Sequence, residues 1–156
     1  MIGKLTETEI QALLAQQVVG RIACYNDDFL FLVPVSYAYD NDKIYVRSLE
    51  GTKVNLMRKN PRVCFEVDDI ADMANWQSVI AWGEFEELQA DERDKGLKIL
   101  LQRHLPLSSS VTTHLGRTWP FSGDETDQIS GIVFRINLSK KTGLFERTSS
   151  NGAMLD

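Results

Sequence analysis

Several residue types that commonly build functional sites are scarce in this 156-residue sequence. It contains two cysteines, Cys24 and Cys64, and two histidines, His104 and His114. Two cysteines cannot build a disulfide framework or a zinc cluster, and no metal-binding motif accompanies the histidines. We therefore expect no metal site, and we interpret both cysteines as small core residues.

Excess positive charge and long apolar runs are also missing. The 17 Lys and Arg against 22 Asp and Glu give a net charge of -5, whereas a nucleic-acid-binding protein needs a basic face. No apolar stretch is long enough to cross a bilayer, and the first nine residues lack the apolar core of a signal peptide. We expect a cytoplasmic protein that binds neither nucleic acid nor membrane.

The composition is that of an ordinary globular protein. Hydrophobic residues make up 43% and charged residues 25% of the chain, and a chain of this length can bury one substantial core. We expect a single domain over residues 1–148, followed by a polar tail over residues 149–156.

Helices are predicted where capping residues precede apolar side chains at helical spacing: residues 7–17, 52–59 and 91–105. Thr6 and Glu9 form the pattern of a capping box before the first. The second should stop before Pro61, because proline disfavours helical geometry in the residue before it. Asp91 is expected to cap the third.

Strands are predicted where apolar and polar residues alternate: residues 18–25, 29–39, 43–48, 63–67, 76–88 and 132–138. Turns are expected at 26–28, 40–42 and 68–74, and Gly83 should mark a bend within a long strand. Six strands at short spacing with few helices favour an antiparallel barrel over a parallel sheet. The expected fold class is therefore mainly β.

The segment from Arg47 to Lys53 is the most informative one for function. A strand ends at Ser48, and a helix begins near Thr52 with free backbone N–H groups, which is an arrangement that suits a phosphate. The alternative is an ordinary capped helix with solvated basic side chains. Lys53 argues against that alternative, because a cation in the first helical turn is unfavourable unless an anion lies beside it.

Pro34 interrupts an otherwise regular strand pattern. Proline removes one donor from the strand ladder, so it indicates an edge strand or a bulge. A functional alternative is that a flat ligand approaches the backbone at residues 33–36.

Five segments occur in the following order: Gly20-Arg21-Ile22-Ala23; Val33-Pro34-Val35-Ser36-Tyr37; Ile44-Tyr45-Val46-Arg47-Ser48 with Gly51-Thr52-Lys53; Asn60-Pro61-Arg62-Val63-Cys64-Phe65-Glu66-Val67; and Trp76-Gln77-Ser78-Val79 with Gly83. Together they resemble the pyridoxamine 5′-phosphate oxidase-like flavoproteins, and within them the nitroimidazole-resistance branch. The resemblance covers roughly the first ninety residues and is more specific than any one motif.

This resemblance implies a split β-barrel that binds flavin mononucleotide (FMN), arranged as a homodimer with the cofactor at the subunit interface. Carried over by position, the cofactor-binding residues are Pro34, Val35, Arg47, Ser48, Thr52, Lys53, Trp76 and Ser78. The four residues between positions 47 and 53 would hold the phosphate. Pro34 and Val35 would lie along the flavin ring, and Trp76 and Ser78 would reach in from the partner.

The resemblance also implies a flavin-dependent oxidoreductase that reduces a small molecule such as a nitro compound. No residue can be named as catalytic, and the substrate-phosphate residues of a true pyridoxamine 5′-phosphate oxidase are not recognisable. Two alternatives remain: a non-catalytic module of the same fold that binds flavin, haem or deazaflavin, and a barrel that has lost its cofactor.

Two further expectations concern surfaces. A strand face with Trp76, Ser78, Ile80 and Trp82 would expose large aromatic groups unless a second copy covered it, which favours a homodimer. Residues 106–130 show no clean period, and their apolar segment at 119–121, Trp-Pro-Phe, is expected to cover the substrate side of the flavin.

Overall fold

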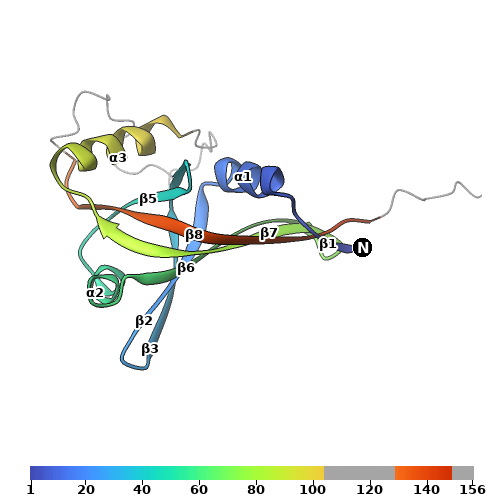
Figure 1. Ribbon diagram of the computed structural model, residues 1–156, viewed down its shortest axis with the longest axis horizontal. Coiled ribbons are helices and arrows are strands. Elements are labelled where there is room, and N and C mark those ends of the chain that lie inside the picture. Colours follow the sequence, from blue (N-terminus) through green and yellow to red (C-terminus); the bar gives the residue numbers. More distant parts are fainter. Residues whose placement is uncertain (104–128, 149–156) are drawn as a thin grey trace, which may run out of the picture.

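The computed structural model describes residues 1–103 and 129–148, which form a mainly β structure (Figure 1). The elements in chain order are β1 (Ile2–Lys4), α1 (Glu7–Gln16), β2 (Val19–Asn26), β3 (Phe29–Ser36), β4 (Ala38–Asp40), β5 (Lys43–Ser48), α2 (Thr52–Lys59), β6 (Arg62–Asp72), β7 (Asn75–Glu87), α3 (Ala90–Gln102) and β8 (Ile132–Glu146). None of the helices in the described ranges is long and apolar enough to span a membrane.

All strand pairs are antiparallel and belong to one sheet. Its order is β3-β2-β6-β7-β8-β5-β4, and β1 adds to β8. Contacts between β3 and β5 bring distant parts of this path together, which curves the sheet into a barrel. In Figure 1, α1 and α3 lie above the long β7 and β8 strands, and α2 lies on the other side.

The core consists of two clusters on either side of the curved sheet. The larger fills the barrel and lies beneath α1; it includes the fully buried Phe65 and Phe134. The smaller lies beneath α3 and includes Tyr45 and Val133. Because side chains alternate along a strand, β5 and β8 contribute to both clusters, as the sequence pattern predicts.

The predicted fold class is confirmed, and all six predicted strands are present. Thr6 and Glu9 form both hydrogen bonds of a capping box, and α2 has the predicted bounds. The short strand β1 is additional, because a strand of three residues is too short to show alternation, and β4 overlaps the end of the predicted strand over residues 29–39.

The prediction of one strand over residues 29–39 is wrong. The chain leaves β3 at Ser36 and changes pairing partner at Tyr37, so that β3 pairs with β2 and β4 pairs with β5. Tyr37 is fully buried, and its hydroxyl donates to the Leu14 carbonyl at 2.7 Å. This contact holds the break between the two strands against α1.

The predicted turn at 68–74 and the predicted end of the last strand at residue 138 are also wrong. β6 and β7 stay paired up to Asp72 and Asn75, with one irregularity after Ile70. β8 continues through the polar residues 139–146 because β7 pairs with that stretch. Lys141 in this stretch also forms ion pairs with Glu7 and Asp42.

The third helix differs from its prediction at both ends. Gln89 is the N-cap residue and makes no side-chain capping bond, so Asp91 lies inside the first turn rather than at the cap. Arg93 in this turn donates to the Ile129 carbonyl at 2.5 Å, which ties the helix to the start of the β8 segment. The helix ends at Gln102, and the predicted continuation through His104 to Pro106 lies outside the described residues.

Gly83 has the predicted special role. The pairing of β7 with β8 shifts register between Trp82 and Gly83. A Cβ atom at Gly83 would lie 2.3 Å from the Asn137 carbonyl oxygen, so a side chain at this position is excluded by the neighbouring backbone.

Replacing Tyr37 with phenylalanine is expected to lower the free energy of unfolding by about 1–3 kcal/mol, because the buried Leu14 carbonyl would lose its hydroxyl donor. Urea denaturation at fixed protein concentration measures the change. Tyr25→Phe is the matched control, since Tyr25 is 51% exposed and should change stability little. Equal stability of Tyr37→Phe and the wild type would contradict a structural role for this hydroxyl.

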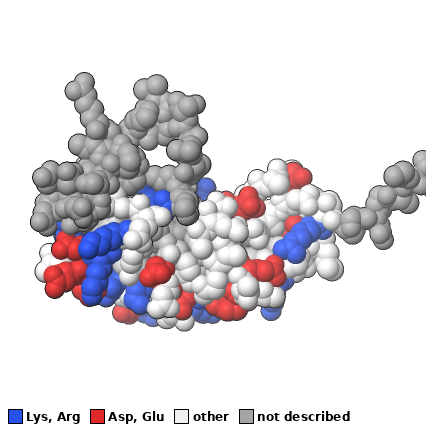
Figure 2. All heavy atoms as spheres, turned by 90° about the horizontal axis from the view of Figure 1, so that it is seen from above, with Lys and Arg blue, Asp and Glu red and all other residues white. Residues whose placement is uncertain are grey.

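Charges of both signs are interspersed on the face of the molecule that Figure 2 shows. Lys and Arg side chains lie beside Asp and Glu side chains, with uncharged surface between them. Ion pairs in the described structure include Arg135 with Glu86 at 2.8 Å and with Glu92 at 3.0 Å.

Candidate functional site

The turn between β5 and α2 leaves helix N–H groups available to a ligand. Gly51 is the N-cap residue of α2 and provides no side-chain cap, and the first turn contains no acidic residue. A Cβ atom added at Gly51 would meet nothing within 4 Å, so the space beside the turn is open. The positive end of the helix dipole therefore faces open space.

Lys53 lies in the first turn of α2 and is half-buried. Burial lowers the pKa of its ammonium group, and no carboxylate in the described ranges pairs with it. An ammonium group that is partly desolvated without a counter-ion is costly. The site thus has the chemistry of an anion site, and a phosphate fits its donors.

Arg47 and Ser48 end β5 just before this turn. The Arg47 Nε donates to the Ser130 carbonyl at 2.7 Å, which fixes the stem of the side chain. Its Nη groups bond no carboxylate within the part of the chain that the structure describes. The Ser48 hydroxyl donates to the Leu49 carbonyl at 2.8 Å. The predicted residues 47, 48, 52 and 53 therefore flank one turn, at the end of β5 and the start of α2.

Arg58 anchors α2 through four hydrogen bonds. Its guanidinium donates to Glu50 at 2.8 and 2.9 Å and to Glu87 at 2.9 and 2.8 Å. These bonds lower the pKa of the Glu87 carboxyl. Sequence analysis did not find this anchor, because Glu87 is distant in sequence and an exposed Arg carries no signal of its own.

The two cysteines have different environments. Cys24 on β2 is buried, as predicted, and burial raises the pKa of its thiol while the nearby Lys53 charge opposes that shift. Cys64 is only half-buried and faces away from the barrel interior, so the prediction that it is a core residue is wrong. It lies on the same face as Trp82, its pairing partner on β7.

Pro34 and Val35 lie on β3, the strand at one end of the sheet path. The edge position explains how the ladder tolerates proline, as one of the two interpretations predicts. Pro34 is exposed, whereas Val35 points into the barrel core and is 7% exposed. Val35 could therefore contact a ligand at the surface only through its backbone.

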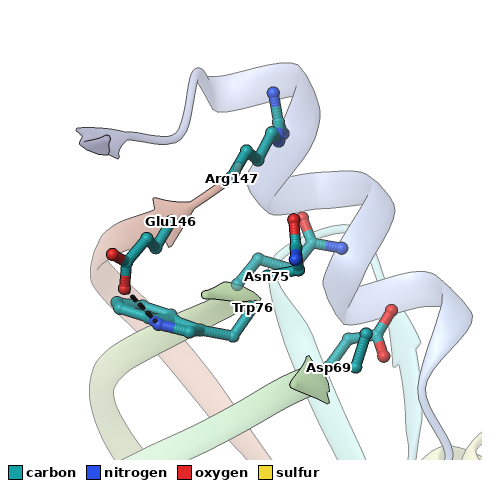
Figure 3. Close-up of a pocket in the computed structure, with 7 residues that line it drawn as sticks. Asp69, Asn75, Trp76, Glu146 and Arg147 are labelled. Carbon is teal, nitrogen blue, oxygen red and sulfur yellow. Dashed lines mark hydrogen bonds between the residues drawn. The ribbon is translucent and has the colours of Figure 1, made fainter. Parts of the chain in front are cut away.

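Trp76 and Ser78 lie at the other end of the molecule. The Trp76 indole Nε1 donates to Glu146 Oε2 at 3.0 Å (Figure 3). A cavity of about 210 Å³ opens beside it, lined by Asp69, Ala71, Asn75, Trp76, Gln77, Glu146 and Arg147. Ser78 is half-buried on the same strand face.

The two groups of predicted cofactor residues are separated by the length of β8. Ser48 pairs with Ile132 at its first residue, and Trp76 pairs with Glu146 at its last. Fourteen residue steps at about 3.3 Å correspond to up to about 45 Å along the strand. Within one chain, these two groups therefore lie at opposite ends of β8.

The described residues contain no group of three or more His, Cys, Asp or Glu side chains that could hold a metal ion. The predicted lid at 119–121 lies outside the described residues. The chemistry that the described geometry supports is therefore anion binding at the β5–α2 turn.

Comparison with known proteins identifies a family match over most of the chain. A family model described as pyridoxamine 5′-phosphate oxidase matches residues 6–134. An uncharacterized protein of Rhizobium meliloti is 33% identical over 88 residues, which make up 56% of this chain and 58% of that protein. The match thus spans less than two thirds of that relative.

Solved structures resemble nearly the whole chain. A FAD-binding protein from Mesorhizobium loti is 28% identical, with 93% of this chain and 98% of that chain covered and a TM-score of 0.70. A candidate 5-nitroimidazole antibiotic resistance protein from Bacteroides thetaiotaomicron is 17% identical, with 93% and 88% covered and a TM-score of 0.68. A FAD-binding protein from Mycobacterium smegmatis is 22% identical, with 94% and 100% covered and a TM-score of 0.64. At these identities, the similarity to the last two structures shows a shared fold alone.

Proposed function

The chain belongs to the pyridoxamine 5′-phosphate oxidase family, and from this premise we propose that it is a flavin-binding protein whose cofactor is FMN. The observation that carries the proposal is the half-buried Lys53, which has no counter-ion among the described residues and lies at the uncapped start of α2. The FAD-binding protein from Mesorhizobium loti, at 28% identity, supports a flavin as the ligand.

The donors at the β5–α2 turn fit a terminal phosphate monoester. Arg47 lies at the end of β5 and Lys53 in the first turn of α2, and the first N–H groups of α2 provide neutral donors beside Lys53. A phosphate that carries close to two negative charges would be neutralised by this pair. We favour FMN over FAD for this reason, since an adenylyl extension would replace the monoester by a pyrophosphate of different shape.

The proposed activity is reduction of a small acceptor such as a nitro compound. When bound, the flavin would supply the electron-transfer chemistry. The chain's own residues would bind the phosphate through Lys53 and Arg47 and keep α2 in position through Arg58. No described side chain is assigned a catalytic role.

A visible spectrum of the purified protein tests the cofactor directly, with mass spectrometry of the released chromophore. A flavin spectrum with a released mass of FMN is the expected result. FAD in the released material would correct the choice of flavin. A haem band, or a colourless protein that cannot be reconstituted with FMN, would contradict the proposal.

We also propose that two copies form a homodimer with the cofactor between them. The phosphate residues and Trp76 lie at opposite ends of β8, so both could serve one ligand only if a second copy supplied one group. Among the described residues, no helix covers one side of β3, β2, β6, β7 and the second half of β8, the side that points away from the barrel interior; we call this side the outer face.

The outer face carries large apolar side chains. Leu32 is 68%, Ile80 39% and Trp82 37% exposed. A hollow of about 340 Å³ in this face is lined mainly by apolar groups, including those of Leu30 and Trp82. Exposed apolar surface of this kind is typical of a protein interface.

Replacing Trp82 with glutamate is expected to weaken the dimer by at least about thirty-fold, because a charge would replace a central aromatic contact. Sedimentation velocity over a range of protein concentrations measures the change. Met73→Glu is the control, because Met73 is 94% exposed in the β6–β7 turn, outside the outer face. A wild-type protein that stays monomeric at micromolar concentration would contradict the dimer.

A further inference from the structure

A charged cluster lies in the middle of the apolar outer face. Strand register places the following residues side by side across it: Leu32, Ala23, Cys64, Trp82 and Lys140 in one row, and Pro34, Arg21, Glu66, Ile80 and Thr142 in the next. Asp68 follows two positions after Glu66, on the same face of β6. Arg21, Glu66 and Asp68 are thus the charged centre of an otherwise mostly uncharged surface.

One guanidinium nitrogen serves both carboxylates of this cluster. Arg21 Nη1 lies 3.2 Å from Glu66 Oε2 and 3.1 Å from Asp68 Oδ2. The side chain of Glu66 is 30% exposed and that of Asp68 is 26% exposed, so both are more buried than Arg21, which is 42% exposed. With both carboxylates ionised, the cluster carries one uncompensated negative charge.

Among the residues that the structure describes, the groups around Glu66 do not supply the missing positive charge. Pro34 on β3, Ile80 on β7 and Thr142 on β8 lie in the same row as Glu66 and are uncharged. Ser78 on β7 is also uncharged. On β6, burial raises the pKa of the Cys64 thiol, which keeps it neutral. Lys140 on β8 lies over the Trp82 ring, one row away, at 5.1 Å from its centroid. Burial and the adjacent Asp68 raise the pKa of the Glu66 carboxyl even in the single chain.

We propose that a second copy of this chain covers the Arg21–Glu66–Asp68 cluster and that Glu66 takes up a proton from solvent when the dimer forms. The proposal rests on the homodimer proposed above. An uncompensated charge is costly in an interface from which water is excluded, and protonation of one carboxylate leaves each cluster neutral. The dimer is then favoured at low pH, and it weakens as the pH rises through the range in which Glu66 ionises.

The test is the dimer dissociation constant as a function of pH, measured by sedimentation on the full-length, cofactor-loaded protein. For each proton taken up, linkage allows up to about a tenfold change in the constant per pH unit. We expect the wild-type constant to rise at least about tenfold between about pH 5.5 and 8. Glu66→Gln should remove most of this dependence and give the tighter dimer at pH 8.

Asp68→Asn provides an independent variant. It leaves Arg21 and Glu66 as a neutral pair, so the pH dependence should also fall. Glu84→Gln is the control, because Glu84 is exposed at the end of the same face and lies opposite Arg62 in the strand register, away from the cluster. This variant should keep the wild-type pH dependence. Circular dichroism confirms that each variant is folded.

The outcomes separate this inference from the proposal on which it rests. A stable dimer with a pH-independent constant, or an unchanged pH dependence in Glu66→Gln and Asp68→Asn, would overturn the proton uptake and leave the dimer intact. A folded protein that is monomeric at every pH would overturn both.

Discussion

Replacing Lys53 with alanine is expected to weaken FMN binding by about tenfold to more than a hundredfold, while riboflavin binding hardly changes. A hydrogen bond to a charged group contributes about 1.5–3 kcal/mol, and Lys53 is the half-buried cation at the start of α2. Riboflavin has no phosphate, so its binding affinity should not change when this contact is lost.

Fluorescence titration of the apoprotein with each flavin measures the two affinities. Lys59→Ala is the matched control, because Lys59 lies in the last turn of the same helix and is exposed. Its FMN affinity should stay close to that of the wild type. If Lys53→Ala weakened FMN and riboflavin equally, or neither of them, the β5–α2 turn would not be the phosphate site.

Replacing Phe65 with alanine is expected to lower the free energy of unfolding by about 3–5 kcal/mol, because it would leave a cavity in the barrel. Phe65 is fully buried, and its ring lies edge-on to Tyr37 with 4.9 Å between the ring centroids. It also packs so closely on Gly20 that a Cβ atom there would lie 2.2 Å from the ring. Repacking can therefore close the space only in part.

Urea denaturation at a fixed protein concentration measures this loss, since coupling to a dimer makes apparent stability depend on concentration. Phe29→Ala is the matched control, because Phe29 lies at the start of β3 and is 53% exposed. We expect it to change stability much less. A similar loss for both substitutions would show that Phe65 is not a central core residue.

The sequence pattern correctly predicted the helices and strands that depend mainly on residues close together in the chain. In β5 and the first half of β8, apolar and polar residues alternate because the two faces of each strand contact different core clusters. The Thr6 capping box involves only neighbouring residues in the chain. The second half of β8 was missed because its polar residues are held by pairing with β7. Strand formation depends on such neighbours more than helix formation does.

The residues of the candidate site also divide into those that a local sequence pattern can predict and those that it cannot. Arg47 and Lys53 could be associated from the sequence alone because only a short turn separates them. Ser130 and Glu87, which orient Arg47 and Arg58, are distant in sequence and carry no motif. The likeness to a known family suggested Trp76 as a candidate site residue, which no local pattern could connect to a turn at the other end of β8.

The position of β8 in the sheet has a consequence for the timing of folding during synthesis. β8 is made after β1, β5 and β7, yet it pairs with all three. While residues 132–146 are still inside the ribosome, β5 and β7 each have an open edge, and β1 has no partner among the described strands. Such edges invite pairing with other chains. We infer that the nascent chain is most prone to aggregate just before β8 emerges.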